Sequence, residues 1–327
     1  MLPGATESEE EVPIAEHPVL DDHFPQARVN FPRGVVSLPD VVYSIVSGYR
    51  PLRMDLYLPA SSDPEKPLII FLHGGAWQGG HTRHAGAFDN WPGVLASIAA
   101  RGFVVASAEY RLSGEARYPA AVLDVKSAVR WLRANATRYG IDSERVAIWG
   151  VSAGGQLAAL VATTCGESAF ESPAIAHAPG EPSDCVQRVV TWYGAFDFAH
   201  LVTTAPIGTG GEPEAASPEA RYLGCSPGSC SSSLVRQASP IAHVDAQDPP
   251  MLLIHGVEDR TVPATQSQRM YAELKAKGVR TELVLIPGVD HSFIGGSPDA
   301  TSRASRLALE KTLSFFDALA GVSSAPD

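Results

Sequence analysis

The stretch RVAIWGVSAGGQLAALVATT, residues 145–164, decides the fold of this chain. It opens as a short apolar strand and ends as a helix, and the turn between them is Gly150-Val151-Ser152-Ala153-Gly154, a G-x-S-x-G sequence. A serine at a sharp strand-to-helix turn projects its hydroxyl above a sheet, and glycines on either side avoid clashes across the turn. The stretch therefore predicts an α/β fold with Ser152 as a nucleophile.

Short apolar runs alternate with helical stretches along the rest of the chain. Strands are expected at 68–72, 103–110, 145–149, 188–193, 251–256 and 281–287. Helices are expected after Pro119 and at 153–164, 264–277 and 302–319. Runs that are apolar on both faces suit a parallel sheet covered by helices, and residues 41–59 add a β-hairpin. The pattern predicts an open, mostly parallel sheet flanked by helices.

The chain of 327 residues is long enough for one large domain with insertions. Residues 1–34 are acidic and Pro-rich, which predicts an irregular arm ahead of a catalytic domain over 35–327. Within that domain, 195–240 is rich in Gly, Pro and Ser and interrupts the alternation of strands and helices. A long irregular segment of this kind predicts a small lid-like insertion over a pocket.

The formal net charge of −11 belongs largely to the arm. Seven acidic residues and no basic one precede Arg28, and without them the charge is only −4. A nucleic-acid partner is not expected, because phosphate binding needs clustered Lys and Arg. A membrane partner is not expected either, since no run approaches the roughly 18 apolar residues of a membrane span.

The cysteines and the first residues point to different compartments. MLPGATESEEEVP lacks the basic and apolar regions of a secretory signal, which favours the cytoplasm unless a signal has been removed. Cys225 and Cys230 flank a Ser-Pro-Gly-Ser turn, so a disulfide between them is expected, and Cys165 with Cys185 would form a second. Four cysteines allow three pairings, and bridged cysteines favour a secreted or periplasmic protein.

A nucleophilic serine needs a base, and the base needs a carboxylate that fixes its tautomer. His291 follows the expected strand at 281–287, and Asp259 follows that at 251–256. Both therefore belong to the sheet edge where open α/β sheets bind ligands. The order Ser152, Asp259, His291 predicts a catalytic triad.

Other acids and histidines near these positions are weaker candidates. Glu258 and Asp290 adjoin the predicted triad, but neighbours on an extended stretch point to opposite faces, and Asp290 is too close to His291 in sequence. His255 is expected to be a buried, hydrogen-bonded residue. The histidines at 73, 81 and 84 have no carboxylate or thiolate at ligand spacing, so neither a metal nor a cofactor is expected.

The turn HGGAW at 73–77 follows the strand at 68–72. In acyl transfer an oxyanion develops, and fixed backbone N–H groups must point at it. A Gly-rich turn lets the backbone approach a substrate, and Ala153, directly after the nucleophile, adds another N–H. HGGAW is therefore a candidate oxyanion turn, with a β-turn around a buried histidine as the alternative.

With these motifs the chain resembles the α/β-hydrolase superfamily over nearly all of residues 40–320. It is most similar to bacterial esterases related to hormone-sensitive lipase, and among them to the carbohydrate and feruloyl esterase group. The motifs that carry this likeness are HGGAW (73–77), ASAEYRLSGEARYPAA (106–121), GVSAGG (150–155), TWYGAFDF (191–198), ASPIAHV (238–244) and DPPMLLIHGVEDRTVP (248–263).

The resemblance implies the α/β-hydrolase fold and a carboxylesterase that acts on small short-chain or aromatic, feruloyl-type esters. It places the oxyanion hole at Gly75, Ala76 and Ala153, although Ala76 stands where the family usually has a third glycine. Trp77 would border the substrate pocket or belong to the core. A serine peptidase of the same fold and a non-catalytic binding protein are the alternatives, and the oligomeric state is not predicted.

Overall fold

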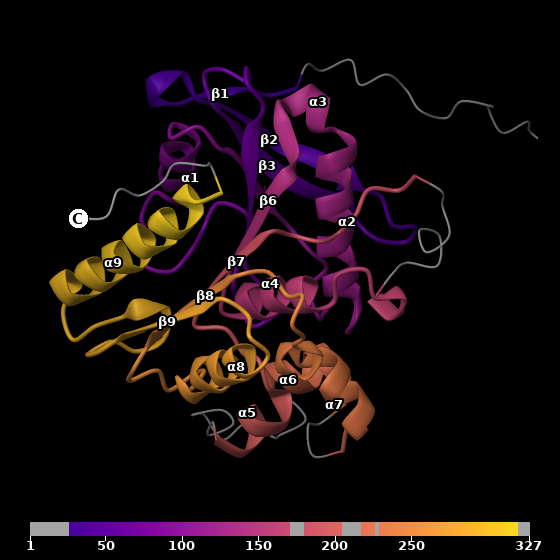
Figure 1. Ribbon diagram of the computed structural model, residues 1–327, viewed down its shortest axis with the longest axis vertical. Coiled ribbons are helices and arrows are strands. Elements are labelled where there is room, and N and C mark those ends of the chain that lie inside the picture. Colours follow the sequence, from indigo (N-terminus) through magenta and orange to yellow (C-terminus); the bar gives the residue numbers. More distant parts are fainter. Residues whose placement is uncertain (1–25, 171–179, 205–216, 226–228, 320–327) are drawn as a thin grey trace, which may run out of the picture.

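Nine strands form one sheet in the computed structural model, which describes residues 26–170, 180–204, 217–225 and 229–319 (Figure 1). Their order across the sheet is β1-β2-β3-β5-β4-β6-β7-β8-β9. The strands are β1 (Val29–Asn30), β2 (Val36–Ser44), β3 (Leu52–Leu58), β4 (Lys66–Leu72), β5 (Val104–Ala108), β6 (Ile141–Val151), β7 (Arg188–Trp192), β8 (Met251–Gly256) and β9 (Thr281–Ile286).

The sheet is antiparallel at one end and parallel through the rest. β1, β2, β3 and β5 pair antiparallel, and every pair from β5 through β4, β6, β7 and β8 to β9 is parallel. The expected hairpin is confirmed as β2 and β3, and all six strands expected from apolar runs are present. Strand β1 and a 3-10 turn at Pro32–Gly34 occupy the end of the predicted irregular arm; residues 1–25 of that arm lie outside the described residues.

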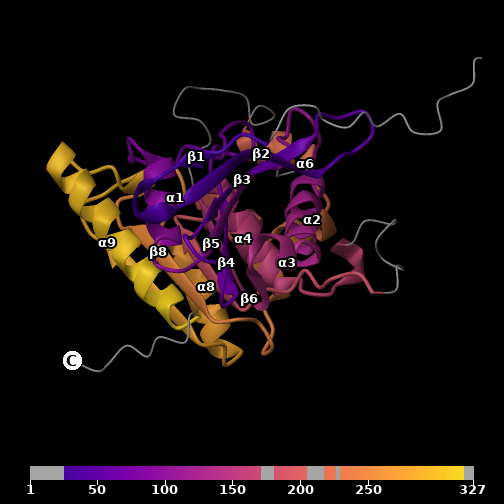
Figure 2. The same ribbon diagram turned by 90° about the horizontal axis from the view of Figure 1, so that it is seen from above.

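Helices cover both faces of the sheet (Figures 1 and 2). One face carries α1 (Trp91–Ala99) and α9 (Pro298–Asp317), and the other carries α2 (Ala120–Ala134), α4 (Ala153–Thr163) and α8 (Thr265–Ala276). A short helix, α3 (Ala136–Tyr139), follows α2. The sheet residues alternate between the two apolar cores, so Leu68 and Ile70 face one core while Ile69 and Phe71 face the other.

Helix α2 shows how the sequence pattern produces this packing. Its apolar residues Val122, Val125, Val129 and Leu132 are fully buried, as their spacing of three and four residues predicts. The sequence pattern did not predict α1, where Pro92 and Gly93 stand in the first turn. Asn90 begins that helix by accepting a hydrogen bond from Gly93 N at 3.0 Å, a capping arrangement that Asn favours.

The predicted lid segment is largely helical where it is described. It contains α5 (Phe198–Thr204), α6 (Pro218–Leu223), α7 (Ser232–Ala238) and the start of a 3-10 turn at Pro240–His243. Residues 205–216 and 226–228 of the segment lie outside the described residues. In Figure 1 these helices lie together beside α4 and α8, at one end of the sheet. Cys225 and Cys230 form the expected disulfide, which joins the end of α6 to the start of α7.

Candidate active site

Ser152 lies at the turn between β6 and α4, where the backbone is strained. Its φ of 53° falls in the left-handed region, which is uncommon for any residue but glycine. A Cβ atom on Gly150 would lie 2.0 Å from the carbonyl oxygen of Gly154, and one on Gly154 would lie 2.4 Å from those of Leu72 and His73. Glycine at both positions is therefore what lets the turn close and approach β4.

The three residues of the predicted triad meet in the folded chain. His291 Nε2 lies 3.0 Å from Ser152 Oγ, and His291 Nδ1 lies 2.8 Å from Asp259 Oδ2. Ser152 follows β6, Asp259 follows β8, and His291 follows β9, so three parallel strands place them at one edge of the sheet. Ser152 and His291 are half-buried, while Asp259 is buried. In this arrangement the Ser152 hydroxyl can give its proton to the His291 imidazole while the Asp259 carboxylate holds the ring in place.

The protein stabilises the charged form of Asp259. Its Oδ1 accepts hydrogen bonds from the backbone N–H groups of Thr261 and Val262, at 3.0 and 2.8 Å, and its Oδ2 lies 3.2 Å from His255 Nε2. Burial alone would raise the pKa of this carboxyl, but the hydrogen bonds from His255 and His291 outweigh burial and bring the pKa to about 2. Asp259 is therefore a carboxylate throughout the neutral range.

Glu258 and Asp290 serve the loops around the site. Glu258 accepts a hydrogen bond from Val289 N at 3.0 Å, and its side chain is exposed. Asp290 accepts hydrogen bonds from the N–H groups of Arg260, at 2.9 Å, and His291, at 2.7 Å. Both acids thus hold the loop that carries His291, and neither contacts its imidazole. His255 is fully buried between Ser267 Oγ and the carbonyl of Val262, as a hydrogen-bonded strand-end histidine should be.

The HGGAW turn presents free backbone N–H groups beside Ser152. Within the described residues, no hydrogen bond is donated by the N–H groups of Gly75, Ala76 or Ala153. Gly75 has a φ of 115°, and a Cβ there would lie 2.3 Å from the carbonyl of Gly79, so this position requires glycine. Ala76 also has a positive φ, 54°, which adds strain to the turn. Three free N–H donors near a nucleophile are suited to hold an oxyanion.

His73 supports this turn from below. Its imidazole stacks on the ring of Tyr110, with centroids 4.4 Å apart, and Tyr110 Oη donates a hydrogen bond to the His73 carbonyl at 2.8 Å. Burial lowers the pKa of His73 to about 4, so the ring is neutral at physiological pH. His73 is thus a buried residue that supports the turn.

Trp77 lies in the core, the second of the two roles considered for it. Its side chain is 3 % exposed, and its ring stacks on Tyr222 of α6 with centroids 4.7 Å apart. Its Nε1 donates a hydrogen bond to Gln156 Oε1 at 3.0 Å, which ties the turn to α4. Trp77 also has a positive φ, 57°, and it is not among the residues that line the cleft above Ser152.

A cleft of about 430 Å³ opens above Ser152. Most of its lining residues are small or polar: Gly74, Gly75, Ala76, Gly80, His84, Ala85, Gly86, Val151, Ser152, Tyr193, Thr261, His291 and Ser292. Sequence reasoning did not identify Tyr193, although it ends the TWY run after β7. Its ring meets His291 edge-on, with centroids 4.8 Å apart, and a Cβ on Gly86 would lie 3.3 Å from its hydroxyl. Tyr193 therefore supports the imidazole and limits the width of the cleft.

The described residues hold no group of three or more His, Cys, Asp or Glu residues arranged as a metal site. Nor is any helix in that part of the chain both long enough and apolar enough to cross a bilayer.

Solved structures share this architecture closely. A truncated carbohydrate esterase from gut microbiota superposes with a TM-score of 0.71, at 28 % sequence identity over 89 % of this chain and 99 % of that one. The propionate-bound esterase Est2 of Thermogutta terrifontis superposes with a TM-score of 0.63, at 27 % identity over 87 % of this chain and 95 % of that one. These likenesses confirm the predicted α/β-hydrolase fold.

The sequence comparisons agree with the structural ones. Esterase LipC of Mycobacterium tuberculosis is 33 % identical over 229 residues, which is 69 % of this chain and 53 % of the relative. The chain thus spans about half the length of the curated relatives it matches. The BD-FAE family model matches residues 54–274, about two thirds of the chain, and includes Ser152 and Asp259. On this match the chain belongs to the BD-FAE family, within the hormone-sensitive-lipase-like esterases of the α/β-hydrolase superfamily.

Proposed function

We propose that this protein hydrolyses carboxylic esters, with Ser152 as nucleophile, His291 as general base and Asp259 as the carboxylate that orients it. The observation that carries the proposal is the unbroken line from Asp259 through His291 to Ser152 Oγ, at 2.8 and 3.0 Å, beside free N–H groups. The esterases among its relatives support the same reaction class.

The geometry supports a reaction in two steps. His291 Nε2 removes the proton from Ser152 Oγ as the oxygen attacks the ester carbonyl, and the resulting imidazolium faces the Asp259 carboxylate. The N–H groups of Gly75, Ala76 and Ala153 hold the oxyanion. The imidazolium then gives its proton to the departing alcohol, which leaves an acyl group on Ser152. Water, deprotonated by His291, then attacks the acyl carbonyl, and the imidazolium returns the proton to Ser152 Oγ as the bond to the acyl group breaks and the acid leaves.

The proposed substrates carry short or aromatic acyl groups. The cleft volume of about 430 Å³ lies in the lower half of the usual range for ligand pockets, and Tyr193 limits its width. Est2 of T. terrifontis has been solved with propionate and with butyrate, which supports short acyl groups for this chain too. We expect acyl groups of about two to six carbons to fit the cleft. The carbohydrate esterase among the structural neighbours supports a sugar ester as the natural substrate.

A substrate panel tests this range. We expect kcat/KM for nitrophenyl esters to be highest between acetate and hexanoate and to fall towards palmitate, because methylenes beyond the cleft gain no burial. Methyl ferulate tests the aromatic acyl group. A maximum at laurate or longer would contradict the esterase assignment and favour a lipase.

Titration with an active-site phosphonate tests catalysis itself. We expect one equivalent to bind Ser152 covalently and to abolish turnover, with the adduct located by peptide mass analysis. A protein that binds esters without reacting with the phosphonate would be a non-catalytic relative.

A further inference from the structure

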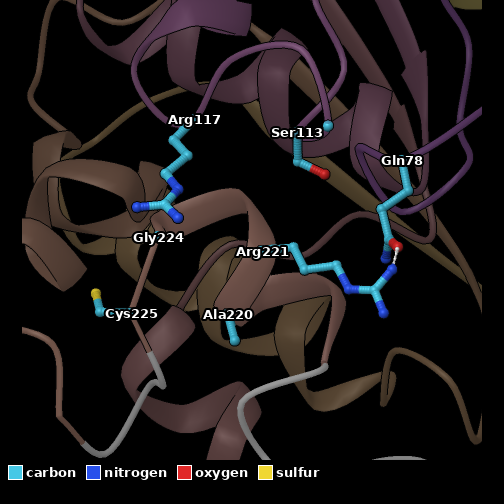
Figure 3. A pocket seen from close by; sticks show the side chains of 8 residues that line it. Gln78, Ser113, Arg117, Ala220, Arg221, Gly224 and Cys225 are labelled. Carbon is cyan, nitrogen blue, oxygen red and sulfur yellow. Dashed lines mark hydrogen bonds between the residues drawn. The ribbon is translucent and has the colours of Figure 1, made fainter.

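A second cavity lies on the other side of the HGGAW turn. It has a volume of about 480 Å³ and shares no lining residue with the cleft above Ser152. One wall comes from the turn and the loop after β5, and the other from α6 and the residues that follow it (Figure 3). Its lining residues are Gln78, Ser113, Gly114, Arg117, Ala220, Arg221, Gly224 and Cys225.

Two guanidinium groups line this cavity from opposite walls. Arg117 comes from the loop after β5, and Arg221 comes from α6 (Figure 3). Among the described residues, neither has a carboxylate within 4.0 Å. The acid nearest to Arg117 in sequence, Glu115, is already bound to Arg50 and to the N–H group of Leu112. The cavity thus concentrates positive charge in a protein whose net charge is −11.

The surrounding residues fix both arginines. Arg221 Nη1 donates a hydrogen bond to Gln78 Oε1 at 2.8 Å, which holds that guanidinium across the cavity. Arg117 packs over Gly224, where a Cβ would lie 2.5 Å from Arg117 Cδ and 3.1 Å from its Nε. Gly224 ends α6 with a φ of 80°, so the residue that closes the helix also leaves the room that Arg117 occupies.

The HGGAW turn and the residue after it border both cavities. Ala76 lines the cleft above Ser152, and Gln78 lines the second cavity. The backbones of Ala76 and Gln78 are at most about 7 Å apart, because only two residues separate them along the chain. A leaving group that extends from Ser152 past this turn would enter the cavity that holds the arginines.

We propose that the cavity lined by Arg117 and Arg221 binds a carboxylate carried by the alcohol part of the ester substrate, such as that of an acidic sugar or a phenolic acid. Guanidinium groups match carboxylates in charge and in planar donor geometry. The proposal rests on the proposed hydrolase function and adds a preference for acidic over neutral leaving groups.

Matched acetate esters test this preference. The probes are 3-acetoxybenzoate and the longer 4-acetoxycinnamate, each compared with its neutral amide, so that the acetyl ester stays the same while the charge changes. For at least one pair we expect Arg117→Ala combined with Arg221→Ala to lower the acid-to-amide ratio of kcat/KM about fivefold, mainly through KM. Hydrolysis of the amides should stay within about twofold, and the wild-type ratio should fall with added salt.

Two control variants separate this site from general effects. Arg303→Ala removes an exposed positive charge on α9, and Gln78→Ala removes the hydrogen bond to Arg221 while both charges remain. Neither should lower the acid-to-amide ratio as far as the double variant does. A ratio for both pairs that is unchanged in the double variant, or lowered equally by Arg303→Ala, would overturn the proposal.

A binding measurement keeps the test independent of turnover. In the Ser152→Ala background, 4-acetoxycinnamate should bind about fivefold more tightly when both arginines are present, as followed by tryptophan fluorescence. Benzoate is the probe for a free anion. If benzoate binds through the arginines while acetoxycinnamate affinity and the acid-to-amide ratios do not depend on them, the cavity is a free-anion site and the proposal is wrong. If neither the acidic esters nor their neutral amides are hydrolysed, the hydrolase assignment fails, and the binding result still decides the carboxylate site.

Discussion

Three side chains from three strand ends make up the proposed proton path, and each has a different environment. Ser152 is held by a strained backbone, His291 by Asp259 and the ring of Tyr193, and Asp259 by backbone N–H groups and His255. Because these constraints come from separate elements, substitutions can distinguish chemistry from structure.

Replacing Ser152 by Ala should remove nearly all ester hydrolysis, by at least about a thousandfold in kcat, and leave the circular dichroism spectrum unchanged. His291→Ala should cost a similar factor, because members of a triad act as a unit. Asp259→Asn should cost less but still orders of magnitude. Glu258→Gln is the matched control, since Glu258 contacts only the backbone of Val289, and a larger loss there than at Asp259 would reassign the acid.

Protonation of His73 in mild acid should lower the stability of the folded protein. Its folded-state pKa of about 4 lies below the ordinary histidine value near 6.5, so the unfolded chain binds this proton more readily. The contribution is complete above pH 6.5 and is lost as the pH falls towards 4, by about 3 kcal/mol in all. Urea unfolding across this range should show a smaller pH dependence in His73→Gln than in the wild type. An equal pH dependence in the two proteins would show that His73 is not the responsible group.

At the scale of elements, the approach of α4 to β4 decides the site. Gly154, in the first turn of α4, packs against the carbonyls of Leu72 and His73. The N-terminus of the helix therefore lies directly behind the HGGAW turn. A side chain at this contact would move Ala153 away from the turn that carries Gly75 and Ala76, and so would separate the residues of the proposed oxyanion hole.

Gly154→Ala should therefore lower both stability and activity. A Cβ only 2.4 Å from two backbone oxygens forces the helix or the strand to move, and we expect a loss of about 3 kcal/mol in the free energy of unfolding. Gly296→Ala is the control, because nothing lies within 4 Å of a Cβ there, and its effect should be within about 0.5 kcal/mol. Equal losses in the two variants would contradict the packing argument.

At the scale of the whole molecule, two disulfides join segments that are not strands of the sheet. Cys165–Cys185 joins the end of α4 to the start of β7, and Lys126 Nζ binds Asp184 Oδ2 at 2.6 Å beside it. Cys225–Cys230 joins α6 to α7. Their loops differ in length, with sequence separations of 20 and 5, so their effects on stability should differ.

Loop-closure entropy predicts about 3 kcal/mol from Cys165–Cys185 and about 2 kcal/mol from Cys225–Cys230. Replacing each pair by alanines should lower Tm more for the first pair. The second replacement should mainly loosen the region of α6 and α7, seen as faster amide hydrogen exchange there. Non-reducing alkylation followed by intact-mass analysis checks the bridges themselves, and four free thiols would refute both.

The sequence by itself determined the sheet, the order of its parallel strands along the chain, and the positions of Ser152, Asp259 and His291. These follow from local rules: apolar runs of strand length predict buried strands, and chemistry-bearing residues directly after such runs lie at one sheet edge. The disulfide between Cys225 and Cys230 could likewise be predicted from the short turn between them.

Only the tertiary structure decided which neighbours each side chain meets. Trp77 fits a pocket wall or a core by sequence, and the partners that place it in the core, Tyr222 and Gln156, lie far away along the chain. The short helices within residues 195–240 carry weak local signals and are stabilised by packing against the rest of the fold. The arginines at 117 and 221, which line one cavity, share no sequence pattern, because a cavity between distant segments depends on long-range packing that no local rule encodes.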